Sequence, residues 1–356
     1  MILDKLRKKF KNKTVIVTGH TGFKGSWLSL WLSFVGAKVI GVSNKVVTNP
    51  SHFRAINLGK DIEEKFFDIS DSKKTFKLFK NNKPDFVFHL AAQAIVRKSL
   101  SNTEETWRSN LMGTLSILES LKKLNNKCSA VLITSDKVYK NLEIDKGYKE
   151  NDTLGGSDPY SASKVATEFL IKSYLESFFF KKKNIFISVA RAGNVIGGGD
   201  WSEERLIPDC IKSWVKNKKV IIRNPRSTRP WQHVLEVLFG YLILADKLSE
   251  NSKLHGQIFN FGPPSKNNFS VMDVLKILKL KWSNAKWKIK RSNFKEQKLL
   301  RLNSKKASKV LKWKCKLNFK QTINLVLDWY INFYFKKRDV KQFSIKQIKI
   351  YCEKLN

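Results

Sequence analysis

The chain has 356 residues, of which 42% are hydrophobic, enough for one large domain with a smaller companion. Its four cysteines are scattered without the paired spacing of a metal site or a disulfide framework, which argues against a secreted, disulfide-stabilised protein. The formal charge is +38, but the lysines are spread through nearly every segment, which disfavours a dedicated nucleic-acid surface.

The sequence predicts no targeting or membrane segment. Every apolar run is interrupted by Lys, Asn or Gly before it reaches the length of a transmembrane helix. The basic N-terminal stretch, MILDKLRKKFKNK, lacks the apolar core of a signal peptide. We therefore expect a cytoplasmic protein whose partners include neither a membrane nor a nucleic acid.

Residues 14–42 predict a dinucleotide-binding unit. An apolar run leads into a glycine-punctuated turn, an apolar helical pattern follows over 27–34, and a second apolar run begins at Lys38. The first glycine permits the sharp turn, the second lets a pyrophosphate approach the backbone, and the third brings helix and sheet close together. The expected cofactor contacts in this turn are Gly19, Thr21, Gly22, Phe23 and Gly25.

Strand and helix patterns then alternate along the chain. The predicted strands cover 65–68, 86–92, 130–134 and 185–190, and the predicted helices cover 72–80, 104–123 and 160–178. This alternation predicts an α/β fold with a Rossmann-type, doubly wound parallel sheet. The functional loops should lie at the carboxyl ends of the strands.

The pattern becomes irregular after residue 190. The predicted helices there cover 205–216, 231–248, 270–280 and 319–335, and the predicted strands cover 220–223 and 257–261. We expect the last of these strands to return to the main sheet. The predicted Rossmann-type domain therefore comprises 1–190 plus about 231–262. A smaller α+β substrate domain would comprise about 191–230 plus 263–356, with the site between the two.

Tyr160 and Lys164, in DPYSASKVATEF, are the most informative pair in the chain. A spacing of four residues puts both side chains on one face of a helix, one turn apart. A lysine ammonium beside a phenol favours the phenolate, so the tyrosine can act as a base well below its usual pKa of about 10. The preceding strand ends in the hydroxyls of Thr134 and Ser135, which favours a catalytic role over a chance spacing.

Five segments in this order make the chain similar to the extended short-chain dehydrogenase/reductase superfamily, which contains sugar-nucleotide dehydratases and epimerases. They are TGHTGFKG, HLAAQ, TSD, YSASK and ARAGNVIG, and they span essentially the whole chain.

The segment ITSDKVY refines the resemblance. Ser135, Asp136 and Lys137 present a hydroxyl, a carboxylic acid and an amine, which alone could equally be a solvated strand end. The 4,6-dehydratases of the superfamily carry an acid–base pair at the last two positions, and its epimerases lack that pair. Having Asp-Lys there, together with GHTGFKGSWLSLWL and RNPRSTRPWQHVLEVLFGYL, resembles the CDP-glucose 4,6-dehydratase branch.

This resemblance implies conversion of CDP-glucose to CDP-4-keto-6-deoxyglucose, a step towards deoxysugars of cell-surface polysaccharides such as O-antigen. Tyr160, helped by Lys164 and Ser135, would take the C4 hydroxyl proton while hydride passes to NAD⁺. Lys137 would remove the C5 proton and Asp136 would protonate the departing C6 hydroxyl, before the hydride returns to C6. Because a lysine base must be neutral, Lys137 could instead stabilise an enolate.

The choice of cofactor is only partly encoded in the residues. The acid that commonly binds the ribose after the second strand is missing; Ser43 and Asn44 stand there, followed by Lys45, so NADP is compatible on charge. The resemblance favours NAD. Further expected cofactor contacts are Asp68, Ile69, Ala91, Ala92, Gln93, Thr134, Tyr160 and Lys164.

The resemblance also assigns Asn194 and Arg229 to the nucleotide diphosphate of the substrate. Trp231 could stack on a base or pack internally, and Asn110 could shape the active-site helix or serve only in packing. We expect His233 to be structural and no metal to be bound, because none of the five histidines has partners at metal-ligand spacing.

The helices predicted over 104–123 and 160–178 carry more apolar surface than one sheet face needs. Members of the superfamily pair these helices between subunits, so we expect a homodimer, with a tetramer as the alternative. Two other functions stay open on sequence alone. One is another NAD(P)-dependent sugar-nucleotide dehydratase or 4-epimerase, and the other is a non-catalytic basic protein that binds NAD or nucleic acid.

Overall fold

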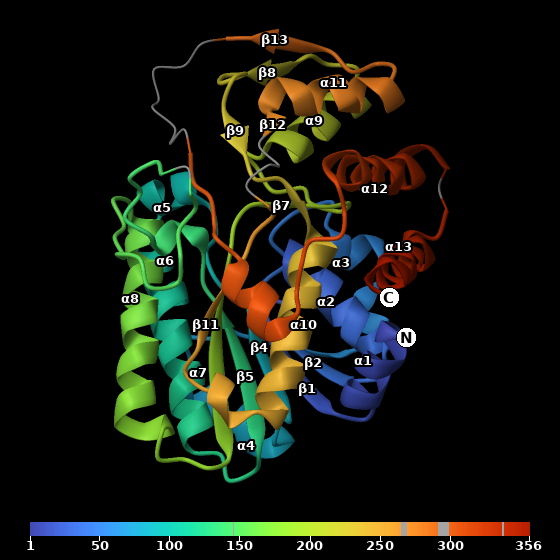
Figure 1. Ribbon diagram of the computed structural model, residues 1–356. Coiled ribbons are helices and arrows are strands. Elements are labelled where there is room, and N and C mark those ends of the chain that lie inside the picture. Colours follow the sequence, from blue (N-terminus) through green and yellow to red (C-terminus); the bar gives the residue numbers. More distant parts are fainter. Residues whose placement is uncertain (145, 265–268, 291–298, 337) are drawn as a thin grey trace.

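The centre of this computed structural model is a seven-stranded sheet in the order β11-β6-β5-β4-β1-β2-β3, in which every pairing is parallel (Figure 1). The structure describes residues 1–144, 146–264, 269–290, 299–336 and 338–356. The strands are β1 (Thr14–Thr18), β2 (Lys38–Ser43), β3 (Glu63–Phe66), β4 (Phe86–His89), β5 (Cys128–Ile133), β6 (Ile185–Ala192) and β11 (Ile258–Phe261). The chain order reverses at β1, between β2 and β4, and this creates the crevice where such folds bind ligands. The predicted Rossmann-type sheet is confirmed.

Helices cover both faces of the sheet. One face packs against α4 (Ser72–Asn82), α7 (Gly113–Lys122) and α8 (Pro159–Tyr174). The other packs against α1 (Ile2–Phe10), α2 (Phe23–Phe34) and α10 (Val234–Glu250), with α13 (Val340–Leu355) outside them. The helix α2 is buried over most of its surface because the sheet, α10 and α13 surround it. Within the described ranges, no helix is both long and apolar enough to cross a membrane.

A smaller layer lies above the carboxyl ends of the strands (Figure 1). It contains three helices, the last of which is α12, and two short strand pairs. These are α9 (Leu206–Val215), β8 (Val220–Ile222) with β13 (Trp287–Ile289), β9 (Thr228–Arg229) with β12 (Phe269–Ser270), α11 (Val271–Lys281) and α12 (Phe319–Ile331). The division into two domains stays a prediction, and α13 lies beside α1 and α2 of the larger layer.

Two predicted strands have other bounds in the structure. The strand expected over 65–68 lies at Glu63–Phe66, where it pairs only with β2 at the sheet edge and is too exposed to give an apolar signal. The strand expected over 86–92 ends at His89, whose ring is hydrogen-bonded to the hydroxyls of Thr18 and Thr114. The residues after His89 leave the sheet and line the cleft described below.

The helix expected over 104–123 is divided. A π-helical turn at Arg108–Met112 separates α6 (Thr103–Trp107) from α7, and a second π-helical turn, Leu175–Phe179, extends α8. The helices α1 and α13, which pack against each other, were not predicted. The helix predicted from residue 231 begins later, as α10, because the short strand β10 (Gln232–His233) precedes it and pairs with β7 (Val195–Ile196).

Candidate active site

The glycine turn after β1 forms an anion-binding cradle. Gly22 caps α2 without a side-chain hydrogen bond, and the first turn of α2 has no acidic residue. Gly19 has a φ of 76°, and a Cβ on Gly25 would lie 2.0 Å from the Gly19 carbonyl oxygen. The turn therefore folds tightly onto the helix, whose free N–H groups and positive dipole end suit a pyrophosphate.

Every residue assigned to the cofactor lines one cleft at the carboxyl ends of β1, β2, β4 and β5. These residues are Gly19, Thr21, Gly22, Phe23, Gly25, Asp68, Ile69, Ala91, Ala92, Gln93, Thr134, Tyr160 and Lys164. The structure thus brings together side chains separated by more than 100 positions in the sequence. Their roles towards a bound cofactor remain predictions.

The end of β2 carries hydroxyl groups instead of an acid. The Ser43 hydroxyl accepts a hydrogen bond from the Thr21 N–H at 3.3 Å, and the Thr21 hydroxyl donates to the Lys45 carbonyl oxygen at 2.7 Å. Asp68 lies further along the cleft, where it accepts hydrogen bonds from the backbone and hydroxyl of Ser70. The Asp68 carboxylate is therefore already held in one orientation by Ser70.

Tyr160 and Lys164 both project from α8 into the cleft. Burial raises the pKa of the Tyr160 phenol to about 12, outweighing a hydrogen bond with Ser135 that lowers it. Burial also lowers the pKa of Lys164 to about 8, and its amine donates to the Ile133 carbonyl oxygen at 3.4 Å. Burial thus dominates the Tyr160 pKa in this structure, and the expected help of Lys164 in forming the phenolate stays a prediction.

The turn Asp136–Val138 follows β5 and begins at Ser135, which caps it. The Ser135 hydroxyl accepts from the Lys137 N–H at 3.2 Å and donates to Asp136 Oδ1 at 3.1 Å. Asp136 is buried, and burial raises the pKa of its carboxyl although Lys137, Ser135 and Lys24 lower it. Since Ser135 also hydrogen-bonds to Tyr160, the acid and the phenol belong to the same site.

The Lys137 side chain does not line the same cleft as Tyr160. It borders a neighbouring cavity, together with Tyr139, Lys140, Asn141, Leu300 and the segments 155–157 and 161. Ser135 and Asp136 line neither cavity; they lie beside Tyr160, where Asp136 is buried. A hexose that contacts both Tyr160 and Lys137 would have to reach both cavities.

Sequence reasoning missed Lys24 as a cleft residue. It lies in the first turn of α2 and lines the cleft together with Tyr160. Burial lowers the pKa of Lys24 to about 8, and the Arg205 guanidinium acts in the same direction, whereas Asp136 raises it. The signal was present in the sequence, because Lys24 is the one charged residue of the segment that forms α2.

Comparisons with known proteins agree with this geometry. The model of the family described as GDP-mannose 4,6 dehydratase matches residues 16–326. The chain belongs to this family. It is also 41% identical over 327 residues to a CDP-glucose 4,6-dehydratase of Salmonella typhimurium, covering 90% of this chain and 91% of the relative. The predicted membership in the sugar-nucleotide dehydratases is confirmed.

Solved structures share the fold at lower identity. A UDP-glucose 4-epimerase of Thermotoga maritima, solved with UDP-glucose, superposes with a TM-score of 0.77 at 23% identity, covering 91% of this chain and 99% of that one. A UDP-glucuronic acid 4-epimerase of Bacillus cereus, solved with UDP-glucuronic acid and NAD, has a TM-score of 0.76 at 22% identity, covering 90% and 100%. These likenesses support the fold that this dehydratase family member adopts.

Asn110 connects the helices that flank the cleft. It lies fully buried in the π-helical turn after α6, accepts from the Gln93 N–H at 2.8 Å and donates to the Ser163 hydroxyl at 2.9 Å. Asn110 thus joins a residue of the cleft wall to α8, which carries Tyr160. A π-helical turn at such a position is a common feature of functional sites.

The two residues assigned to the substrate lie elsewhere. Asn194 is exposed after β6, and Arg229 lies on β9, where its guanidinium donates to the Thr228 carbonyl oxygen at 2.8 Å. In the part of the chain that the structure describes, Asn194 and Arg229 do not line the cleft that contains Tyr160. His233 is buried with its pKa lowered to about 3 by burial, and its ring accepts from the Leu235 N–H, in line with the predicted structural role.

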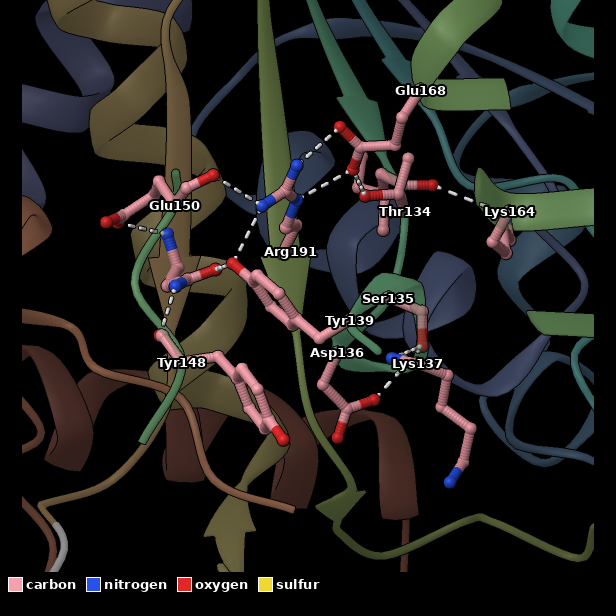
Figure 2. A network of polar contacts seen from close by, with 12 residues as sticks. Thr134, Ser135, Asp136, Lys137, Tyr139, Tyr148, Glu150, Lys164, Glu168 and Arg191 are labelled. Atoms are coloured by element: carbon pink, nitrogen blue, oxygen red, sulfur yellow. Dashed lines mark hydrogen bonds and ion pairs between the residues drawn. The ribbon is translucent and has the colours of Figure 1, made fainter. Parts of the chain in front are cut away.

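A buried ion pair, Glu168 with Arg191, lies behind the turn that carries Ser135 and Asp136 (Figure 2). Neither residue was predicted from the sequence. Glu168 stands four residues after Lys164 on the same face of α8, so the spacing that identified Lys164 could have identified Glu168 too.

Proposed function

We propose that this protein is an NAD-dependent CDP-glucose 4,6-dehydratase, which forms CDP-4-keto-6-deoxyglucose and water. The observation that carries the proposal is the placement of Asp136 and Ser135 beside Tyr160, because an acid next to an oxidising site is what elimination at C5–C6 requires. CDP-glucose as the substrate is supported by the Salmonella typhimurium relative, which is 41% identical over 90% of this chain.

The residues present fit NAD. The glycine turn and the start of α2, which has no side-chain cap, would hold the pyrophosphate. The cleft near Asp68 would hold the adenosine, and the cleft near Tyr160 would hold the nicotinamide. The lack of an acid after β2 is compatible with either dinucleotide, and two structural neighbours of this fold were solved with NAD. NAD held by these residues would supply the acceptor for the C4 hydride and the donor of hydride to C6.

The first task of the protein is to remove the C4 hydroxyl proton. Tyr160 would accept it, since Tyr160 lines the cleft and the nearby Ser135 hydroxyl lowers its pKa. The Lys164 ammonium, one helical turn away, would stabilise the phenolate that forms. Because burial raises the Tyr160 pKa to about 12, this positive charge is needed for the proton transfer.

The second task is elimination of water across C5 and C6. Burial raises the pKa of Asp136 and therefore favours its protonated form, which can donate to the departing C6 hydroxyl. Lys137 is our candidate for the C5 proton, either as its acceptor or as the cation that stabilises the enolate. It borders a cavity other than the one that Lys24 and Tyr160 line.

The proposal extends to the substrate site and the assembly. Asn194 and Arg229 would bind the nucleotide diphosphate; Arg229 lies on β9 of the smaller layer. We further propose a cytoplasmic homodimer, or a tetramer built from it, that acts in the synthesis of deoxysugars for surface polysaccharides such as O-antigen.

The test is incubation of the purified protein with CDP-glucose, UDP-glucose and dTDP-glucose in parallel. A 4-keto-6-deoxy product absorbs in alkali, and an epimer does not. We expect this absorbance with CDP-glucose and its loss in Tyr160→Phe. Absorbance with another nucleotide instead would reassign the substrate, and an epimer without absorbance would replace dehydration by 4-epimerisation.

A further inference from the structure

One buried ion pair holds both ends of the turn that carries Ser135, Asp136 and Lys137 (Figure 2). At the near end, the Thr134 hydroxyl donates to Glu168 Oε1 at 2.6 Å. At the far end, the Tyr139 hydroxyl accepts from Arg191 Nη1 at 2.7 Å. The residues immediately before Ser135 and immediately after Val138 are thus tied to the same two side chains.

The ion pair itself has a fixed geometry. Arg191 Nε donates to Glu168 Oε1 and Arg191 Nη2 to Glu168 Oε2, both at 2.8 Å, so the contact is bidentate. The side chains are 1% and 3% exposed, so water does not compete for these bonds. A buried ion pair often adds little net stability, because desolvation offsets the attraction. The function of this ion pair is therefore better judged from the positions that it fixes than from its contribution to stability.

The pair also connects the turn to the helix that carries the other reactive groups. Glu168 lies on α8, four residues after Lys164 and eight after Tyr160, on the buried face of the helix. Arg191 lies on β6, next to β5, whose end leads into the turn. One ion pair therefore fixes α8 relative to the turn, and so Tyr160 relative to Asp136.

Tyr139 is the link in this network that can be changed without leaving a charge unpaired. Its hydroxyl also donates to Asn260 Oδ1 at 2.8 Å, and its ring stacks on Tyr148 with centroids 4.9 Å apart. Arg191 keeps further partners, including the Glu150 carbonyl oxygen at 2.9 Å. Removal of the Tyr139 hydroxyl would loosen one end of the turn and leave the ion pair satisfied.

We infer that Tyr139, Glu168 and Arg191 are positioning residues for the dehydration, which hold the Ser135–Lys137 turn in register with Tyr160 and Lys164. This inference rests on the proposed function. It predicts that loosening the turn slows the chemical step and leaves the binding of both ligands unchanged. Glu168 and Arg191 line neither cavity, and Tyr139, which borders the cavity of Lys137, has its hydroxyl bonded to Arg191 and Asn260.

Tyr148→Phe provides a matched control for Tyr139→Phe. Both tyrosines are buried in the same small cluster, and both hydroxyls make two hydrogen bonds; those of Tyr148 join Asn141 and the Leu142 N–H, away from the ion pair. The two variants should lose similar thermal stability. We expect kcat of Tyr139→Phe to fall about tenfold or more, with KM for CDP-glucose and affinity for NAD unchanged, and Tyr148→Phe to keep its kcat within about twofold.

A double-mutant cycle with Thr134→Val adds a second readout. Since Thr134 and Tyr139 act through the same ion pair, their effects on kcat should be non-additive, whereas Thr134→Val and Tyr148→Phe should combine additively. Equal kcat values for Tyr139→Phe and Tyr148→Phe, or a Tyr139→Phe defect confined to KM, would overturn the inference. An inactive wild-type protein would instead count against the proposed function.

Discussion

At the scale of single residues, burial shifts the pKa values of four ionisable groups in and beside the cleft. Asp136 and Tyr160 have their pKa values raised and Lys24 and Lys164 have theirs lowered, and in each case desolvation is the largest cause. Each of these groups is therefore pushed towards its neutral form. This arrangement suits a site that moves protons at neutral pH.

Asp136→Asn tests the acid. The amide cannot donate the proton that the departing hydroxyl needs, so we expect kcat to fall by at least about 10²-fold. Because the pKa of Asp136 is raised, the folded state holds this proton more tightly than the unfolded state, and ionisation costs stability as the pH rises through the folded pKa. The variant should therefore melt at a higher temperature than the wild type at about pH 8, and the difference should shrink towards about pH 4. Calorimetry at both pH values measures this, and a variant that is less stable at both contradicts the account.

Lys24→Met tests the cation that sequence reasoning missed. Activity should fall above about pH 8, where Lys164 loses the proton that stabilises the phenolate. Since the Lys24 charge lowers the pKa of Lys164, its removal should move this alkaline limb to higher pH. Lys24→Arg keeps a charge at all pH values and should leave the limb where it is or move it lower. A pH profile of kcat decides the matter, and an unmoved limb in Lys24→Met would refute the coupling.

At the scale of elements, the glycine turn and α2 show two separate requirements. A Cβ on Gly25 would lie 2.0 Å from the Gly19 carbonyl oxygen, which is backbone and cannot move aside. A Cβ on Gly22 would meet the same oxygen at 3.3 Å, which a small shift can relieve. The third glycine is thus needed for folding, and the second is needed for the approach of a ligand.

Gly25→Ala and Gly22→Ala should separate these requirements. We expect Gly25→Ala to lower the free energy of unfolding by about 1–3 kcal/mol through overpacking. Gly22→Ala should stay near wild-type stability and bind NAD more weakly. Denaturant unfolding and a titration with NAD measure the two effects. The same loss of stability in both variants would contradict the distinction.

How far the sequence predicts the structure depends on where each signal lies. The glycine turn and the Tyr160–Lys164 spacing are local patterns, and the structure brings both into one cleft. The Glu168–Arg191 pair joins α8 to β6, so the contact between the two side chains could not be predicted from local sequence patterns. The terminal helices α1 and α13 were missed although each has buried residues four positions apart, Leu6 and Phe10 in α1 and Ile348 and Cys352 in α13; that the two helices pack together is evident only in the fold.

At the scale of the whole molecule, apolar side chains remain uncovered on the outer face of the helices beside the cleft. Phe169 on α8 is 59% exposed, Phe178 is 41% exposed and Met112 is 45% exposed. They lie on or next to the helices that we expect to pair in a homodimer. Exposed apolar groups of this size are typical of protein interfaces.

Phe169→Lys should weaken that dimer, since it puts a charge into an apolar contact. We expect the wild type to have the mass of a dimer or tetramer by light scattering, and the variant to shift towards the monomer. Leu280→Lys is the control, because Leu280 is 80% exposed on α11, far along the chain from α8. A monomeric wild type, or an unchanged Phe169→Lys, contradicts the proposed interface.

The central claim is that one cleft oxidises C4, eliminates water across C5–C6 and reduces C6 of the same hexose. CDP-glucose labelled with deuterium at C4 tests it most directly, with NMR of the product formed by the purified protein. We predict a 4-keto-6-deoxy sugar that carries the deuterium at C6. A product that keeps the label at C4, or loses it from the sugar altogether, would contradict the account.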